Sequence, residues 1–125
     1  MKDQTLAMVI ARPGQVRDSL QVLLTAIPQI DAVLVVDDGP AALDIGMKNR
    51  SALVLLDFDL PKDEAWVTLQ QIKTAWPRTQ CIALVDHEQE QEIAKAAGAD
   101  VALIKGILAA RLGTTIEELL IQQEA

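Results

Sequence analysis

The sequence predicts an α/β protein with a doubly wound, five-stranded parallel sheet in which a helix follows each strand, the pattern (βα)5. Short apolar runs alternate with segments of helical spacing along all 125 residues. The connecting segments are long enough for helical crossovers, which parallel strands require. The run at residues 52–56 is apolar without alternation, as expected for a central strand that is buried on both faces.

Strands are expected where apolar runs end at turn-forming or charged residues. The predicted strands are residues 6–11, 32–36, 52–57, 81–85 and 101–104. Arg12-Pro13-Gly14 follows the first run, and Asp37-Asp38-Gly39-Pro40 follows the second. The third run ends at Asp57, which places a carboxylate at the end of the central strand.

Helices are expected where apolar residues recur every three or four positions. The predicted helices are residues 15–27, 41–49, 66–76, 86–97 and 115–124. Pro28 and Pro77 terminate the first and the third, Gly46 is a weak spot in the second, and Thr115 with Glu118 forms a capping box for the last. The apolar stripe of the third helix, which we expect in the core, consists of Trp66, Leu69, Ile72 and Trp76.

Composition excludes several classes of protein. The length predicts a single domain spanning residues 1–125, and the net charge of −7 without a basic cluster argues against direct nucleic-acid binding. No apolar stretch is long enough to span a membrane, and residues 1–5 are polar, so we expect a cytoplasmic protein without membrane association. The single cysteine, Cys81, lies in an apolar run and is expected to be a reduced core thiol.

Three segments match one known family in order and spacing. They are ALVLLDFDLP, which contains Asp57, then LQQIKTAWPRTQCIAL, and finally AKAAGADVALIKG, which contains Lys105. With these segments the chain resembles the receiver domain of two-component response regulators over essentially its whole length. The resemblance implies the flavodoxin-like topology of that family, with Asp57 at the carboxyl end of the third strand and Lys105 at the end of the fifth.

The resemblance implies a phosphoryl-transfer site at Asp57. In a complete receiver, a histidine kinase phosphorylates this aspartate, a lysine contacts the phosphate, and an acidic pair at the end of the first strand holds Mg²⁺. The sequence LVVDD at residues 34–38 imitates that pair but belongs to the second strand. The alignment instead places Ala11 and Arg12 there, so we expect no cofactor and at most a weak metal site at Asp57 and Asp59. Mg²⁺ is expected only if phosphoacceptor activity is retained.

Other positions of the resemblance also differ from a complete receiver. Val85 replaces the Ser or Thr whose hydroxyl follows the phosphoryl group, and Ala102 replaces the aromatic residue that normally reorients with it. Gly106 follows Lys105 in place of Pro, as in receivers found upstream of helix-turn-helix output domains. Residues 106–113 are expected to form a longer link than usual into the last helix.

Three roles are open for Asp57. It is a structural aspartate that accepts hydrogen bonds from turn amides, a phosphoacceptor with Lys105 as its phosphate contact, or a retired phosphosite that is permanently paired with a cation. We expect Arg12 to be that cation, with a solvent-facing turn residue as the alternative. For Lys105, the alternative to phosphate contact is a lysine that extends from the strand end toward solvent.

The first functional hypothesis is an atypical receiver that acts as a regulatory protein-interaction module. Its partner would be a histidine kinase, an output domain or another signalling protein, and a second copy of the chain is a further candidate. The alternative is a functional receiver phosphorylated on Asp57 by a histidine kinase. We expect no enzyme beyond slow self-dephosphorylation. A flavodoxin-like small enzyme or nucleotide binder is a distant alternative, because residues 12–15 are too short and too poor in hydroxyls to cradle a phosphate.

Overall fold

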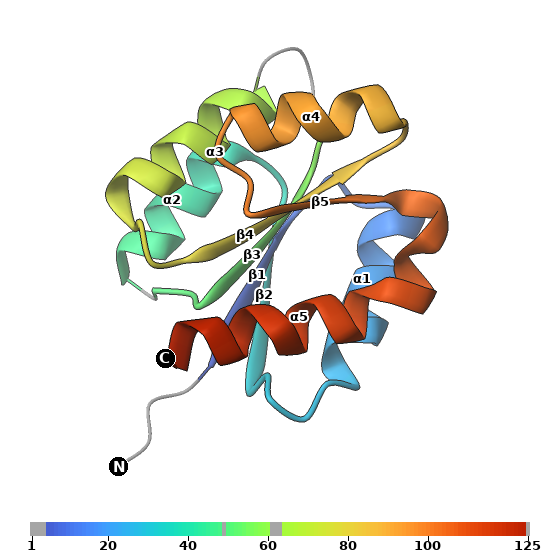
Figure 1. Ribbon diagram of the computed structural model, residues 1–125. Coiled ribbons are helices and arrows are strands. Elements are labelled where there is room, and N and C mark those ends of the chain that lie inside the picture. Colours follow the sequence, from blue (N-terminus) through green and yellow to red (C-terminus); the bar gives the residue numbers. More distant parts are fainter. Residues whose placement is uncertain (1–4, 49, 61–63, 125) are drawn as a thin grey trace.

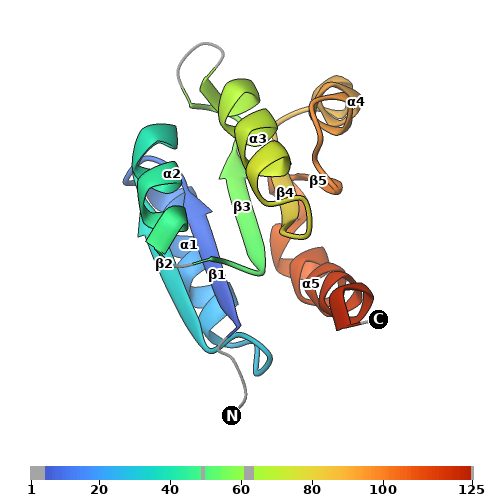
Figure 2. The same cartoon turned by 90° about the vertical axis from the view of Figure 1, so that its left-hand side faces the viewer.

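The computed structural model describes residues 5–48, 50–60 and 64–124, and it contains one parallel five-stranded sheet (Figure 1). The strands are β1 (Leu6–Ile10), β2 (Ala32–Val36), β3 (Leu53–Asp57), β4 (Gln80–Val85) and β5 (Val101–Ile104). Figure 2 shows their order from left to right as β2, β1, β3, β4 and β5. The predicted sheet is therefore confirmed, with β3 at its centre.

Helices cover both faces of this sheet. They are α1 (Gln15–Thr25), α2 (Gly39–Lys48), α3 (Glu64–Ala75), α4 (Glu88–Ala96) and α5 (Leu108–Glu124), and a 3₁₀ turn, η1 (Lys105–Ile107), precedes α5. One buried cluster joins the sheet to α1 and α5, and a second joins it to α2, α3 and α4. Successive strand residues point to opposite faces, so Val9 belongs to the first cluster and Met8 to the second.

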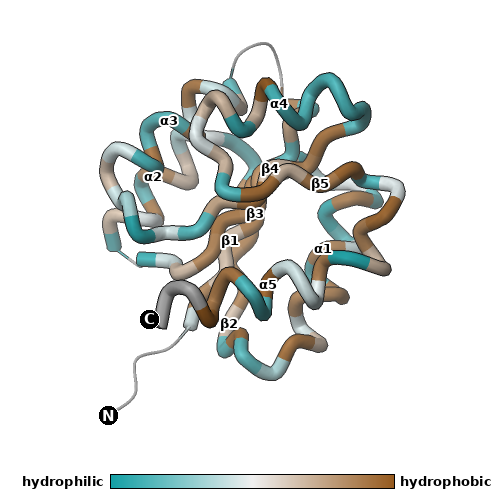
Figure 3. Tube along the Cα trace, in the orientation of Figure 1, coloured by the Kyte–Doolittle hydropathy of each residue, from teal (hydrophilic) through white to brown (hydrophobic). Residues whose placement is uncertain are grey.

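The apolar centre of the molecule is formed by the strands (Figure 3). All four residues from Leu53 to Leu56 are buried, which confirms that the unalternating run is a strand covered on both faces. Cys81 is a fully buried free cysteine in β4. Burial raises the pKa of the Cys81 thiol to about 12, so the group stays protonated at neutral pH.

The predicted start of the last helix is wrong. Residues 106–113 do not form a link, because η1 leads directly into α5 at Leu108. Thr115 is buried within α5 and does not cap it. Leu108, Leu112 and Ile116 are spaced by four residues and are buried against the sheet, which continues the helix across the expected boundary.

Three other helix starts also differ from prediction by two residues, and the third helix begins at Glu64 rather than at residue 66. The second helix begins at Gly39 rather than at residue 41, because the Asp38 carboxylate accepts a hydrogen bond from the Ala41 amide at 2.9 Å and caps the first turn. The fourth helix begins at Glu88 rather than at residue 86. Asp86 is therefore outside the helix, immediately after β4.

The predicted core stripe of α3 is buried at its centre and half-buried at its ends. Leu69 and Ile72 are fully buried, whereas Trp66 and Trp76 are half-buried and contact the second cluster. Trp76 lies over Gly46 of α2, where a Cβ atom would be 2.4 Å from the indole ring. The glycine that weakens α2 locally therefore allows α2 and α3 to approach closely. None of the helices in the described part of the chain is long and apolar enough to cross a membrane.

Candidate functional site

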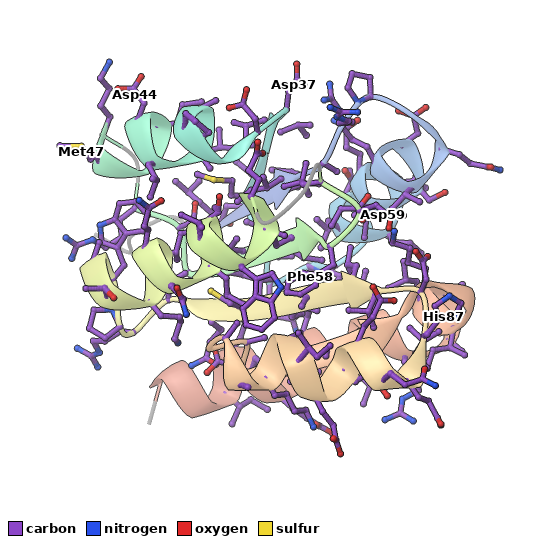
Figure 4. All side chains as sticks on the ribbon, turned by 90° about the horizontal axis from the view of Figure 1, so that it is seen from above. Asp37, Asp44, Met47, Phe58, Asp59 and His87 are labelled. Carbon is purple, nitrogen blue, oxygen red and sulfur yellow. The ribbon has the colours of Figure 1, made fainter. Side chains whose placement is uncertain are left out.

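The carboxyl ends of β3, β4 and β5 bring three charged residues together. Asp57 is the last residue of β3, Asp86 follows β4, and Lys105 follows β5. Asp59 adds a second carboxylate from the loop after β3. Figure 4 shows Asp59 and His87 at the same end of the molecule, to which the strand arrows point. In open α/β sheets this edge is where ligands bind.

The ammonium group of Lys105 lies among three carboxylates. Its Nζ atom is 2.7 Å from Asp57 Oδ1, 2.7 Å from Asp59 Oδ2 and 3.5 Å from Asp86 Oδ1. The side chains of Lys105 and Asp57 are each 13% exposed, whereas those of Asp59 and Asp86 are 59% and 42% exposed. Asp57 and Lys105 therefore form the inner ion pair, and the other two carboxylates lie at its rim.

Hydrogen bonding controls the charges at this site. Burial works to lower the pKa of Lys105, but hydrogen bonds to Asp57 and Asp59 outweigh it and raise the pKa above the ordinary value. The hydrogen bond from Lys105 lowers the pKa of Asp59 against the opposing effect of burial. The hydrogen bond with Asp59 raises the pKa of Asp86. The ammonium is therefore held in its charged form by the carboxylates around it.

Asp57 also accepts a backbone hydrogen bond. Its Oδ1 atom is 2.9 Å from the amide nitrogen of Asp59. One carboxylate oxygen thus receives both a turn amide and the ammonium of Lys105. Two of the expected features, a turn amide and a paired cation, are present together.

Arg12 is not the cation that pairs with Asp57. Arg12 is exposed, and within residues 5–48, 50–60 and 64–124 the ion pair of Asp57 is with Lys105. A different arginine, Arg17 of α1, contacts the segment after β1. Its guanidinium donates to the Ala11 carbonyl at 3.2 Å and forms an ion pair with Asp37. The sequence placed Lys105 at the correct edge, but its pairing depends on the side-by-side arrangement of the strand ends.

The remaining predicted positions are apolar and buried. Ala11 follows β1, is fully buried, and donates its amide to the Val36 carbonyl at 3.1 Å. Val85 ends β4 and Ala102 lies within β5, and both belong to the cluster beneath α2, α3 and α4. Asp86 is the site residue that sequence reasoning missed, because it was assigned to the following helix.

A known protein family matches most of this chain. The family described as the response regulator receiver domain matches residues 12–117. This chain belongs to that family. A search of curated proteins found no match.

Solved receiver structures share the fold. A response regulator receiver domain protein from Clostridium thermocellum is 22% identical, with a TM-score of 0.83 and coverage of 96% of this chain and 97% of that chain. A LuxR-family response regulator from Aurantimonas sp. SI85-9A1 is 20% identical, with a TM-score of 0.84 and coverage of 96% and 87%. A chain from the complex of the CheA3 P1 domain with CheY6 of R. sphaeroides is 20% identical, with a TM-score of 0.80 and coverage of 96% and 99%. These likenesses show the flavodoxin-like receiver fold.

Receiver domains are regulatory domains of two-component signalling that interact with kinases and output domains and bind Mg²⁺ when functional. The residues of this receiver do not fit a magnesium ion well. Ala11 offers no oxygen ligand from its side chain, and the Lys105 ammonium already lies between Asp57 and Asp59. Within the described ranges, no group of three His, Cys, Asp or Glu side chains could hold a metal ion.

Proposed function

We propose that this receiver is an atypical regulatory module that a protein partner recognises in one fixed conformation. The observation that carries the proposal is the Lys105 ammonium, which is bound by Asp57 and Asp59 at 2.7 Å each. The Lys105 ammonium neutralises the Asp57 carboxylate, which would otherwise be a ligand of Mg²⁺. It also competes directly with a metal ion for the same oxygen atoms.

The family positions strengthen this proposal. An acidic pair is absent at Ala11 and Arg12, so a metal ion would depend on the carboxylates that Lys105 already binds. Val85 and Ala102 have neither the hydroxyl nor the ring through which a receiver would respond to a phosphoryl group. We infer that Asp57 and Lys105 have become a structural ion pair that holds the ends of β3 and β5 together.

The partner in this proposal is a protein. A kinase, an output domain and another signalling protein are the candidates, and a homodimer would place a second copy of this chain in the same role. The net charge of −7 disfavours direct contact with nucleic acid.

The test is a titration with beryllofluoride, a phosphoryl mimic, and Mg²⁺, monitored through the amide NMR signals of Asp57, Val85 and Lys105. We expect no saturable shift at any of the three amides. The Lys105→Ala variant is the matched control, because removal of the ammonium opens the carboxylates to the ion. A saturable shift in the unmodified protein would overturn the proposal.

A second candidate function is phosphoacceptance at Asp57. Its support is the position of the Asp57 carboxylate at the sheet edge with Lys105 within hydrogen-bond distance, as phosphoryl contact would require. Incubation with a small phosphodonor and Mg²⁺, followed by intact mass measurement, tests this alternative. An added phosphoryl mass that disappears in Asp57→Ala would establish it, and we expect none at rates typical of complete receivers because metal-ion catalysis contributes several kcal/mol.

A further inference from the structure

Helix α4 is attached to the sheet by little apolar surface. Its sequence is EQEQEIAKA, and Ala94 is its one fully buried side chain, with the C-cap Ala97 buried beside it. Ile93 is 42% exposed. Figure 3 shows hydrophilic colouring at the start of this helix. Two alanines alone provide a weak and non-directional attachment, because hydrophobic stabilisation scales with buried area.

A directed polar contact supplements this apolar attachment. The side-chain amide of Gln91 donates from its Nε2 atom to the Ala102 carbonyl oxygen in β5, at 2.9 Å. Among the described residues it is the one side-chain hydrogen bond that joins α4 to β5. The acceptor is a backbone carbonyl, so only the amino half of the amide can form the bond. Gln91 is half-buried, and loss of the bond would leave the Ala102 carbonyl without this hydrogen-bond donor, which costs free energy.

The other bonds of α4 point elsewhere. Glu90 accepts hydrogen bonds from the amides of Asp86 and His87, at 3.1 and 3.0 Å. These bonds join the first turn of α4 to the segment after β4 and do not reach β5. Gln91 therefore adds a directed contact to β5 that the Glu90 bonds do not provide.

We infer that Gln91 is a positioning residue that fixes α4 on β5, independently of the chemistry at Asp57. The inference goes beyond the proposed function, because the bond joins two parts of the chain that both lie outside the ion pair of Asp57 and Lys105. In this receiver the bond joins α4 to the backbone of Ala102, at the position where the family's switch aromatic is replaced by alanine. The bond therefore needs no side chain at residue 102.

Amide hydrogen exchange of the intact chain, without metal ion or phosphodonor, tests this role. In Gln91→Ala and Gln91→Glu we expect the amides of α4 to exchange about fivefold faster than in the unmodified chain, as loss of one net hydrogen bond predicts. Gln91→Lys keeps an N–H donor on a long side chain and should restore the original rate. The amides of residues 108–120 in α5 should not change in any variant.

Gln89 provides the matched control, since it is exposed on the same helix. Gln89→Ala changes helix propensity, and Gln89→Glu changes charge, by the same amounts as the Gln91 variants, and neither should change the exchange of α4. Unchanged exchange in Gln91→Ala, equal effects at residues 89 and 91, or failure of Gln91→Lys to restore protection would overturn the inference. A beryllofluoride response would overturn the proposed function alone, so the two failures are distinguishable.

Discussion

Helices α4 and α5 lie on opposite faces of the sheet and contact the same edge strand, β5, but they are held in different ways. Helix α5 buries five large apolar side chains, Leu108, Leu112, Ile116, Leu119 and Leu120. Helix α4 buries Ala94, with its C-cap Ala97 buried beside it, and the Gln91 side chain adds a hydrogen bond to β5. A helix with five large buried side chains should tolerate the loss of one polar contact better than a helix that buries two alanines and forms one hydrogen bond to its strand.

The two helices also differ in their relation to the charged site. Helix α5 follows η1, whose first residue is Lys105, so the ion pair with Asp57 lies at its beginning. Helix α4 begins two residues after Asp86, which is a rim carboxylate. We therefore expect changes at Lys105 to reach α5 first.

The largest effect should come from truncation within the packed face of α5. Ile116 is fully buried, so Ile116→Ala should lower the free energy of unfolding by about 2 to 5 kcal/mol through lost burial and an unfilled cavity. Urea unfolding measures the change. Ile121→Ala is the control, because Ile121 is 65% exposed and its truncation should change stability by about 0.5 kcal/mol or less. Equal effects at the two positions would contradict the packing of α5.

Removal of the Lys105 ammonium should have the next largest effect. Lys105→Met leaves the largely buried carboxylate of Asp57 without its cation, and we expect a loss of about 1 to 3 kcal/mol at neutral pH. Hydrogen exchange at residues 106–112 should accelerate more than exchange within α4. Faster exchange confined to α4 would contradict the link between the site and α5.

The stability that this ion pair contributes should decrease at alkaline pH. The folded-state pKa of Lys105 is raised above its ordinary value of 10.5, so the stability it contributes is complete below that value and is lost as pH rises through the folded pKa. Urea unfolding at pH values from below to above 10.5 should show this loss in the unmodified protein. The Lys105→Met variant should show a shallower fall over the same range, and identical slopes would contradict the assignment.

A smaller effect on stability is expected for the attachment of α4. Gln91→Ala should lower the free energy of unfolding by about 0.5 to 1.5 kcal/mol, which is less than the effect of Ile116→Ala. Thermal and urea unfolding would place the two variants on one scale. A larger loss for Gln91→Ala than for Ile116→Ala would reverse the comparison between the two helices.

The smallest effect should be a gain in stability within α5. Gly113 lies in the helix, and a Cβ atom added there would meet no other atom within 4 Å. Gly113→Ala should therefore raise the free energy of unfolding by about 0.5 to 1 kcal/mol, since alanine loses less backbone entropy in a helix. The opposite result is expected for Gly46→Ala, because its added Cβ would meet the Trp76 ring. A loss of stability in Gly113→Ala would show that this part of α5 is not regular helix.

Several features of the fold followed from local pattern. The unalternating run of β3 and the helix-length crossovers predicted a central parallel strand, and parallel strands bring Asp57 and Lys105 to one edge. The start of α5 did not follow from pattern, because Thr115 and Glu118 match a capping box as well as a helix interior. Leu108 and Leu112 became decisive once the sheet provided an apolar face to cover.

The sequence by itself determined the order of strands and helices, the receiver family, and the edge at which Asp57 and Lys105 lie, because periodicity and chain connectivity are local properties. Only the tertiary structure decided which cation Asp57 binds. Lys105, rather than Arg12, reaches it because strands distant in sequence end side by side, and Asp86 joins them for the same reason. The attachment of α4 through Gln91 was likewise decided by the packing of a helix on a strand, which no single segment encodes.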